Sequence, residues 1–508
     1  MRAVLHIWRL IRTGATFERT GAMSQVLHAV DAPRPLRIAL HTLAFPFRWL
    51  GYRGDPALPP TTRALTALGP AYIKFGQIIS TRSDVIGFDL AAELRILQDS
   101  LPPFALDEAR VEIARELSAP VDTLFSEISP AVAAASIAQV HRAMVRETGE
   151  TVAIKVLRPG IDKAFRRDID AFRFCAKLIE TLAPKARRLR PSDVVDHFES
   201  VVQDELDLRI EGASASEFRA KTHDDPMFHV PKVHWDLSAR RVLTMEWVEG
   251  IQAADLQAMD AAGIDRAALA QRLLQQFLRH ALRDGLFHGD MHQGNLRIGP
   301  NGQIIALDFG IMGQLDTYTR RVYAEILYGF VQRDYRRVAE AHFEAGYVPA
   351  DRDIDAFARA LRAIGEPIFG MDASRMSMAK LLSQLFDVTE RFGMQTRTEL
   401  ILLQRTMVVV EGVTRHIDPR SNIWNTSGPV IEDYVRDNIG PRAFLADLSE
   451  AAKVLARLGP RLPDLAERRV IAFSTPPQTQ APKSRPLLWA LTGAVIALVG
   501  FTLGALLP

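Results

Sequence analysis

The sequence predicts an α+β protein with two lobes, a helical extension in front of them and one membrane-spanning helix behind them. Three observations lead to this prediction. Short β-forming runs occur between residues 131 and 250, helical patterns dominate after Gly313, and residues 487–507 carry no charged side chain. A chain of 508 residues has room for two or three domains.

The composition excludes several classes of protein. The 62 Lys+Arg and 60 Asp+Glu residues give a net charge of +2, which argues against a nucleic-acid partner. A hydrophobic content of 48% excludes a mostly disordered chain. Cys175 is the single cysteine, so neither an intramolecular disulfide nor a zinc site built from several thiolates is possible.

Residues 1–60 are a basic amphipathic region. Val4, Ile7, Trp8 and Ile11 recur at helical spacing among arginines. Two interpretations have equal weight, namely a helix on an anionic membrane surface and a helix packed on its own domain. A mitochondrial transit peptide has a similar composition.

Residues 61–130 form a second predicted unit, a helical extension. Pro70 is suited to the first turn of a helix, and Lys74 and Gln77 would then share one face. Tyr72, Phe75 and Ile79 would pack on the body. Taken alone, this pattern favours a surface helix with a solvated Lys74.

Residues 131–250 contain the predicted strands of the first lobe. Lys155 lies inside the buried run Val152–Leu157, where an ammonium group is costly unless it is paired. Glu211 is a candidate partner, and Asp207, four residues before it, would share its helix face. The spacing does not say which of Glu205, Asp207 and Glu211 is paired. The remaining predicted elements are helices over 161–183 and 192–221 and strand-like runs over Val230–His234 and Arg241–Val248.

Residues 251–473 form the second, helical lobe. A helix is predicted from Asp265 to Asp284, followed by a hairpin with arms Asn295–Ile298 and Gln303–Leu307. Beyond Gly313 the pattern is helical to about residue 472.

The chemistry is concentrated between His288 and Gly310. Asp290 and Asn295 are five residues apart in one loop, and Asp308 begins Asp-Phe-Gly after the next strand. Oxygen ligands of this kind suit Mg²⁺ that is shared with phosphates. The same spacing, with a lysine in an upstream Val-Ala-Ile-Lys, is the protein-kinase signature.

The end of the chain predicts a membrane anchor. Residues 474–486 are a Pro-rich linker, and residues 487–507 are 21 uncharged residues, enough to cross a bilayer. Lys483 and Arg485 before the span predict a single pass with the body in the cytoplasm. We expect the bacterial inner membrane, with the mitochondrial inner membrane as the alternative.

Together these motifs resemble those of the UbiB/ADCK family of atypical kinases. Lys74-Phe-Gly-Gln77 resembles the family's Lys-x-Gly-Gln extension, residues 133–141 its alanine-rich loop, and Glu205-Leu-Asp207 its Glu-x-Asp motif. The resemblance covers roughly residues 60–420.

The resemblance implies a kinase-like fold that binds ATP and Mg²⁺ and supports ubiquinone biosynthesis at a membrane. It makes Asp290 and Lys155 catalytic and Asn295 and Asp308 metal ligands. The implied nucleotide contacts are Ala133, Ala134, Ala135, Ser136, Lys155, Glu211, Glu246 and Val248. Lys74, Gln77, Glu205 and Asp207 are implied to regulate the site, with Lys74 near Glu205 and Asp207. Membrane lipid, ubiquinone-biosynthesis enzymes or prenylated quinone precursors are implied partners, and a homodimer stays open.

Two departures bear on function. Met291 and Gln293 stand where the family commonly has proline, and His292 is interpreted as a hydrogen bonder of the loop. After Gly310 there is no Ala-Pro-Glu and no activation segment, which argues against a protein substrate. Three functions are therefore compared: an ATPase or small-molecule or lipid kinase, a Ser/Thr protein kinase, and a nucleotide-binding scaffold.

Overall fold

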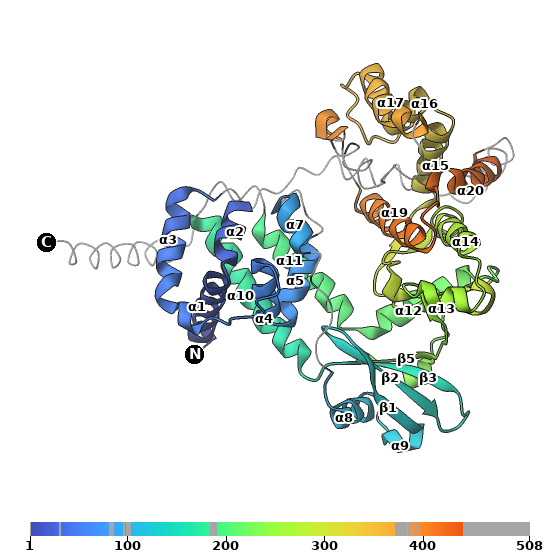
Figure 1. Ribbon diagram of the computed structural model, residues 1–508. Coiled ribbons are helices and arrows are strands. Elements are labelled where there is room, and N and C mark those ends of the chain that lie inside the picture. The colour runs from blue at the N-terminus through green and yellow to red at the C-terminus, as the bar shows by residue number, and fades with distance from the viewer. Residues whose placement is uncertain are drawn as a thin grey trace, which may run out of the picture. The chain divides into compact units, whose positions relative to one another are not determined.

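The computed structural model describes residues 2–29, 32–80, 86–94, 97, 103–182, 190–370, 384, 387–388, 390–394 and 397–439. Residues 1–436 form one unit, and Figure 1 shows its helices and strands. Among the residues that the structure describes, no helix combines the length and apolar composition of a bilayer crossing. The predicted linker and span, 474–507, lie outside the described residues.

A helical layer is built from the N-terminal residues together with two later helices. Its elements are α1 (Arg2–Thr20), α2 (Ala22–Ala29), α3 (Arg34–Ala44), the 3₁₀ helix η1 (Phe45–Leu50), α4 (Pro60–Leu68), α5 (Pro70–Ser80), α7 (Phe88–Leu94), α10 (Ile161–Leu182) and α11 (Pro191–Glu205). Its core contains Leu65, Tyr72, Ile73 and Leu94. Phe172 of α10 packs on Tyr72 and Phe75 with ring centroids 4.8 Å apart.

Helix α1 answers the question left open for the basic N-terminus. Ala15 and Thr16 are fully buried, and Arg9 donates to Asp168 of α10 at 2.8 Å. Thr13 and Tyr72 share a hydrogen bond of 2.8 Å. The structure therefore packs α1 on its own domain.

The first lobe is a four-stranded antiparallel sheet in the order β1-β2-β3-β5, flanked by α8 (Leu106–Leu117) and α9 (Val121–Leu124). Its strands are β1 (Phe125–Ala134), β2 (Ala138–Val145), β3 (Thr151–Leu157) and β5 (Val242–Glu246). Val152, Ile154 and Val156 pack with Ile113 of α8 in one core. Side chains alternate along a strand, so Lys155 lies on the opposite face of the sheet.

Some predicted elements need correction here. Strands β1 and β2 were missed, because β1 has an irregular burial pattern and β2 buries the polar side chains of Gln139 and His141 while it exposes Met144. The predicted domain boundary at 130/131 falls inside β1. The run Val230–His234 is not a strand. The strand is β4 (Phe228–His229), and Val233 makes only an isolated bridge to Met245.

The helix predicted over 192–221 is broken at Leu206 and Asp207. α11 ends at Glu205 and α12 (Leu208–Lys221) begins anew, because the Asp207 carboxylate caps it by accepting from the Arg209 backbone N–H at 3.2 Å. The sequence predicts that Asp207 and Glu211 share one face of a continuous helix. The structure corrects this, because Asp207 is the cap that precedes α12 and Glu211 lies inside α12.

The second lobe begins with small sheets and continues as helices. Its first part comprises β6 (Ile251–Gln252), α13 (Leu256–Ala261), α14 (Arg266–Arg279), a π-helical turn (His280–Asp284), β7 (Leu286–His288), η5 (Gln293–Asn295), β8 (Leu296–Ile298), η6 (Pro300–Gly302), β9 (Ile304–Ala306) and β10 (Met312–Gln314). The 3₁₀ helix η3 (Trp235–Leu237) instead packs on β5 of the first lobe. The strands pair in the orders β4-β9-β8-β6 and β10-β7. The predicted helix before the catalytic loop and the predicted hairpin are both present.

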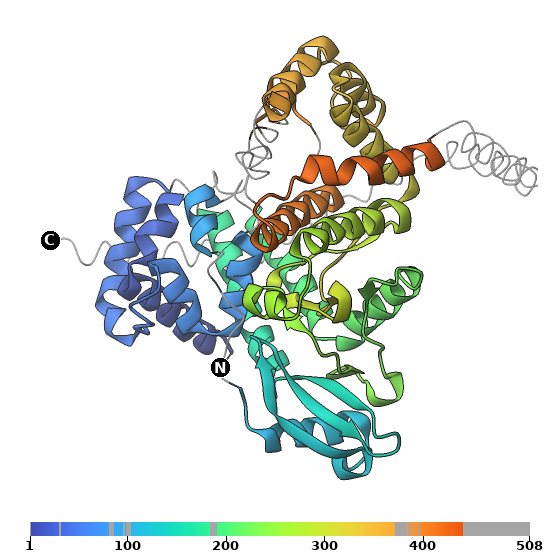
Figure 2. The same cartoon turned by 45° about the vertical axis from the view of Figure 1, so that its right-hand side comes forward.

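The remaining helices are α15 (Thr317–Val331), α16 (Tyr335–Glu344), α17 (Ile354–Gly370), α19 (Thr398–Ile417) and α20 (Ile423–Asn438). Helices α14 and α19 pack side by side (Figure 2). Tyr335 and Phe357 centre a separate apolar core in this part. The described residues thus confirm the predicted helical pattern up to 438.

Candidate active site

Lys155 lies at the centre of a group of charges. Its Nζ is 2.7 and 2.9 Å from the two carboxylate oxygens of Glu211 and 3.2 Å from Oδ2 of Asp308. The Glu211 side chain is 10% exposed, whereas that of Asp308 is 49% exposed. The sheet, α12 and the end of β9 therefore meet at one ammonium group.

The pKa values of Lys155 and Asp308 keep these two side chains charged near neutral pH. Burial disfavours the charged form of Lys155, but the Asp308 and Glu211 carboxylates raise its pKa above the ordinary value. Lys155 in turn lowers the pKa of Asp308 to about 2. Burial raises the pKa of Glu211, against the influence of Lys155.

The backbone aims Asp308 at this point. Asp308 has a φ of 58°, in the left-handed region that side chains other than glycine rarely adopt, and its Oδ1 accepts from the Gly310 N–H at 3.1 Å. Phe309 is buried against Phe218 of α12 and His288. The turn is therefore anchored by Phe309 while the carboxylate of Asp308 stays accessible.

We call residues 288–295, which contain the predicted catalytic residue Asp290, the catalytic loop. Hydrogen bonds within the loop and to Leu307 hold it in place. Buried His288 donates from Nε2 to the Leu307 carbonyl at 3.1 Å, and its Nδ1 accepts from the Asp290 N–H at 3.1 Å. Burial lowers the pKa of His288, so this ring is neutral. His292 accepts from the Gly294 N–H at 3.0 Å, which agrees with its interpretation as a loop hydrogen bonder.

Asn295 and Asp308 together provide oxygen ligands that fit a divalent cation. The Asn295 amide nitrogen donates to the Asp290 carbonyl at 3.1 Å, which leaves its Oδ1 as an acceptor. Leu307 donates its N–H to the Asn295 carbonyl at 2.8 Å, so Asn295 lies beside the start of Asp-Phe-Gly. An amide oxygen and a half-exposed carboxylate are the hard ligands that Mg²⁺ prefers.

The alanine-rich segment is a tight turn between β1 and β2 rather than an open loop. Ala133 and Ala134 pair with Val140 and Gln139, and the Ala135 N–H donates to the Ala138 carbonyl at 2.8 Å. Ser136, a predicted nucleotide contact, is buried inside the turn.

Arg158, which the sequence did not single out, donates to the Ala135 carbonyl at 3.2 Å. It comes shortly after the lysine strand, and only the fold shows that it reaches the turn.

The structure does not bring the Glu246 side chain to Lys155. Lys155 pairs with Leu243 across the sheet, so Glu246 points to the other face by alternation. Its carboxylate accepts from His229 at 3.1 Å and from the Lys232 N–H at 3.0 Å. Val248 lies two residues beyond the end of β5 and is half-buried.

The four residues implied to regulate the site separate into different contacts. Lys74 Nζ is 2.5 Å from Glu205, and both side chains are largely buried, which excludes a solvated Lys74. Asp207 instead pairs with Arg209 at 2.6 Å. Gln77 donates to the Leu97 carbonyl at 3.3 Å.

A second charged cluster, missed in the sequence, joins the loop after α12 to the π-helical turn before β7. Asp225 accepts from buried His280 at 3.0 Å and from Arg283 at 2.9 Å. Arg283 also contacts Asp284. The spacing of these residues in the sequence carries no signal, because the cluster forms only when the loop after α12 meets the π-helical turn.

An open groove of about 480 Å³ lies beside the catalytic loop. One side is formed by His292, Gln293 and Gly294, and the other by Val409, Gly412 and Val413 of α19, with Gln252 and Ala254 at the end. Thr406 of α19 donates to the Gly289 carbonyl at 2.9 Å, so the helix is fixed to the loop.

Comparison with known proteins identifies the domains of the chain. Residues 96–342 match the ABC1 atypical kinase-like domain, and residues 361–422 match the UbiB helical domain. A solved structure, the Rv3197–erythromycin complex from Mycobacterium tuberculosis, superposes with a TM-score of 0.52 at 24% identity, covering 65% of this chain and 84% of that one. This likeness bears on the fold alone and confirms the kinase-like architecture. The fold and site thus define an atypical kinase-like protein.

Relatives in sequence show which family of kinase-like proteins the chain belongs to. The "Probable protein kinase UbiB" of Marinobacter nauticus is 38% identical over 423 residues, 82% of this chain and 77% of the relative. The protein of the same name from Aeromonas salmonicida is 39% identical over 451 residues, which are 87% of this chain and 82% of the relative. The one from Pseudomonas aeruginosa is 36% identical over 507 residues, which are 98% of this chain and 94% of the relative. The chain belongs to the bacterial UbiB family, as the motifs had indicated.

Proposed function

We propose that this chain binds Mg-ATP and either transfers its γ-phosphoryl group to a small molecule or lipid, or hydrolyses it, in support of ubiquinone biosynthesis. The observation that carries the proposal is the contact of Lys155 with both Glu211 and Asp308. The relatives' name, probable protein kinase, agrees with a kinase-like role.

Each residue has a role that follows from its contacts. Glu211 fixes the Lys155 ammonium, which then binds phosphate oxygens. Asp290, whose side chain is 40% exposed, accepts the proton of the attacking hydroxyl or water. Asn295 and Asp308 would hold Mg²⁺, which when bound neutralises charge on the phosphates.

A small acceptor is favoured over a protein by the chain that follows Gly310. Only residues 311–316 separate Asp-Phe-Gly from α15, and three of them form β10. That leaves no platform for an extended peptide. The groove beside His292 has Val409 and Val413 on its α19 side, which suits a partly apolar acceptor.

A second candidate is a protein kinase, which the printed name of the relatives favours.

Steady-state phosphate release by the purified full chain, with and without membrane lipid, distinguishes the candidates. We expect release that disappears in Asp290→Asn, whereas the exposed control His223→Ala keeps it. Absence of release together with tight ATP binding would indicate a scaffold. Phosphate incorporation into a protein substrate that exceeds release would indicate a protein kinase.

Attachment to the bacterial inner membrane by residues 487–507, with the body in the cytoplasm, is part of the same proposal. A chain ending at Thr475 should leave the membrane fraction in carbonate or high salt, whereas the full chain stays. A truncated chain that remains wholly in that fraction would show that another part of the protein is the main anchor.

A further inference from the structure

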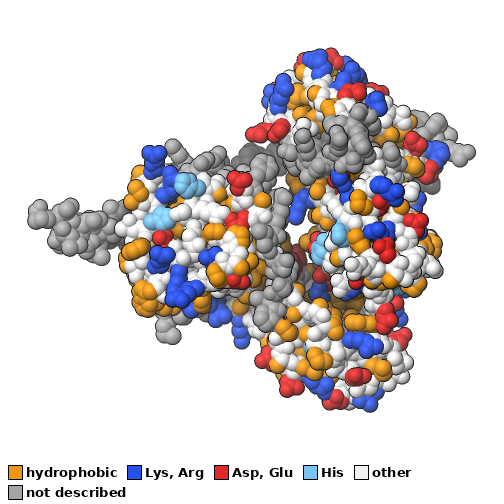
Figure 3. Space-filling model, viewed as in Figure 1, with side chains coloured by type: hydrophobic (Ala, Val, Ile, Leu, Met, Phe, Trp, Pro, Cys, Tyr) orange, Lys and Arg blue, Asp and Glu red, His pale blue; other side chains and the backbone are white. Residues whose placement is uncertain are grey.

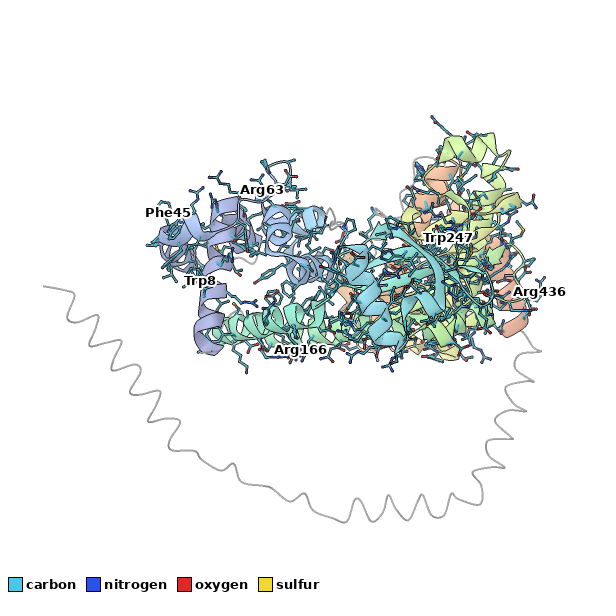
Figure 4. The ribbon with its side chains drawn as sticks, turned by 90° about the horizontal axis from the view of Figure 1, so that it is seen from below. Trp8, Phe45, Arg63, Arg166, Trp247 and Arg436 are labelled. Carbon is cyan, nitrogen blue, oxygen red and sulfur yellow. The ribbon has the colours of Figure 1, made fainter. Side chains whose placement is uncertain are left out.

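Large exposed hydrophobic side chains are concentrated at one place in the helical layer. Of the fifteen large exposed hydrophobics among the described residues, five lie within the twelve residues from Ile38 to Trp49. These are Ile38, Leu43, Phe45, Phe47 and Trp49, and we call their surface the α3–η1 face. The others are dispersed from α1 to α15. Figure 3 shows hydrophobic side chains beside Lys and Arg at the outer edge of the layer, and Figure 4 shows Phe45 at that edge.

The fold holds the α3–η1 face on the outside of the helical layer. Ile38, Ala39, Thr42 and Leu43 share one side of α3 and are exposed. The inner side of α3 is fixed, because His41 pairs with Glu18 of α1 at 2.6 Å and contacts Ser24 of α2 at 3.1 Å. The exposure therefore does not result from a helix without partners.

The 3₁₀ helix that follows is held by its backbone. Arg19 of α1 donates to the carbonyls of Trp49 at 3.2 Å and Gly51 at 2.7 Å. A Cβ added at Gly51 would lie 2.4 Å from the Ala15 carbonyl oxygen, so the chain here runs directly against α1. The Trp49 side chain nevertheless remains 74% exposed.

The charges around the α3–η1 face indicate what kind of surface it binds. Residues 32–54 contain four arginines and no acidic residue, and Arg34, Arg48 and Arg53 are exposed. Exposed Trp and Phe next to a cationic rim suit the boundary between lipid headgroups and acyl chains. A negatively charged bilayer attracts such a rim.

We propose that the α3–η1 face docks on the surface of an anionic lipid bilayer. Leu43, Phe45 and Trp49 enter the headgroup region, while Arg34, Arg48 and Arg53 contact lipid phosphates. The proposal rests on the membrane location proposed above and is independent of the nucleotide chemistry. It adds a second, surface-bound contact to the anchor proposed at the other end of the chain.

The test uses the full chain reconstituted in lipid nanodiscs. Cys175 is replaced by Ser, and an environment-sensitive fluorophore is attached at Ala39→Cys, on the same side of α3 as Leu43. A matched sample carries the fluorophore at Val111→Cys, which is exposed on α8. Quenching by acrylamide is measured in phosphatidylcholine discs and in discs with one third phosphatidylglycerol.

We expect at least twofold less quenching at position 39 in the anionic discs and no change at position 111. The double variant Leu43→Ser/Trp49→Ser should remove the protection, and changing Arg34, Arg48 and Arg53 to Gln should remove its dependence on lipid charge. All these side chains are exposed, so folding should be retained.

Three results would overturn the proposal. Equal quenching at positions 39 and 111 in anionic discs would mean that the face stays in water. Protection in detergent that rises with protein concentration would assign the face to a second copy of the chain. A full chain that does not enter discs at all would remove the membrane location and this proposal with it, while phosphate release would still report on the nucleotide site.

Discussion

Two Lys–Glu pairs lie on either side of one helix break, and they differ in what else they contact. Glu205 ends α11 and binds Lys74 of α5, so that pair joins two helices of the helical layer. Glu211 lies in α12 and binds Lys155 of β3, and that lysine also contacts half-exposed Asp308. The first pair is a closed contact between helices, whereas the second presents a cation to a place that a ligand can reach.

The break at Leu206 and Asp207 makes this division possible. In one continuous helix, Glu205 and Glu211 would be about 600° apart in rotation, or about 120° around from each other. Because the Asp207 cap begins a new helix, the direction in which Glu211 points does not depend on the direction of Glu205. Only Leu206 and Asp207 separate α11 from α12, which is a short link along the chain between the helical layer and Glu211.

The largest expected effect concerns Asp308, the half-exposed carboxylate beside the Lys155–Glu211 pair. It tests whether this carboxylate binds metal and nucleotide. Asp308→Asn removes the charged ligand, so we expect Mg-ATP affinity to fall at least tenfold in calorimetry. Because the pKa of Asp308 is about 2, wild-type binding should not weaken through protonation of this group between pH 8 and pH 5. Unchanged Mg-ATP affinity in a folded Asp308→Asn protein would remove Asp308 from the site.

The next prediction compares the two glutamates directly. Glu211→Gln leaves Lys155 in a buried position with one carboxylate fewer, so it should lower both the thermal unfolding midpoint and the ATP affinity. Breaking a buried ion pair costs about 3–5 kcal/mol, and a smaller cost is expected here because Asp308 remains. Glu205→Gln should lower the midpoint while leaving the affinity within about threefold, because an affinity change of that size corresponds to less than about 1 kcal/mol. Equal losses of affinity in both variants would contradict a division of roles between the pairs.

A third prediction concerns communication across the break. Lys74→Ala should change nucleotide turnover or self-phosphorylation, although Lys74 contacts Glu205 rather than the Lys155 group. Combined with Glu205→Ala, the effect should be non-additive by about 0.5–3 kcal/mol, because residues in contact couple. Strict additivity with wild-type turnover and an unchanged response to lipid would leave Lys74 as a structural residue only.

The sequence located the chemistry better than the strands that carry it. Lys155, Asp290, Asn295 and Asp308 could be found because kinase-like sites depend on residue types at fixed short spacings. Strand β1 was missed because it is irregular, with register shifts. Strand β2 was missed because it buries His141 and exposes Met144, the reverse of what their polarity indicates. The helix break at Asp207 was missed because an Asp inside an amphipathic pattern does not show whether its side chain caps a new helix.

Long-range pairs were the least predictable part. Nothing in the spacing indicated which acid would bind which lysine, and the structure assigns Glu205 to Lys74, Glu211 to Lys155 and Asp207 to Arg209. The Asp225–His280–Arg283 cluster and the contact of Arg158 with the alanine turn also depend on how distant elements pack. The direction of the Glu246 side chain depends on packing too, because the face of β5 that it occupies is set by the pairing with β3.

The smallest effect concerns the alanine turn above the lysine strand. Ala134 ends β1 opposite Gln139, and the turn is closed by the Ala135–Ala138 hydrogen bond and by Arg158. Ala134→Gly enlarges the conformations open to the backbone, and a Gly in a strand interior costs about 0.5–1 kcal/mol relative to Ala. We expect a change of a few-fold in the ratio of ADP to ATP affinity or in turnover, with a small loss of stability. Val132→Gly, at an exposed position two residues earlier in the same strand, is the matched control because it loosens β1 without touching the turn. If Ala134→Gly and Val132→Gly lower stability alike and neither changes nucleotide preference or turnover, the turn contributes to the sheet and not to the nucleotide site.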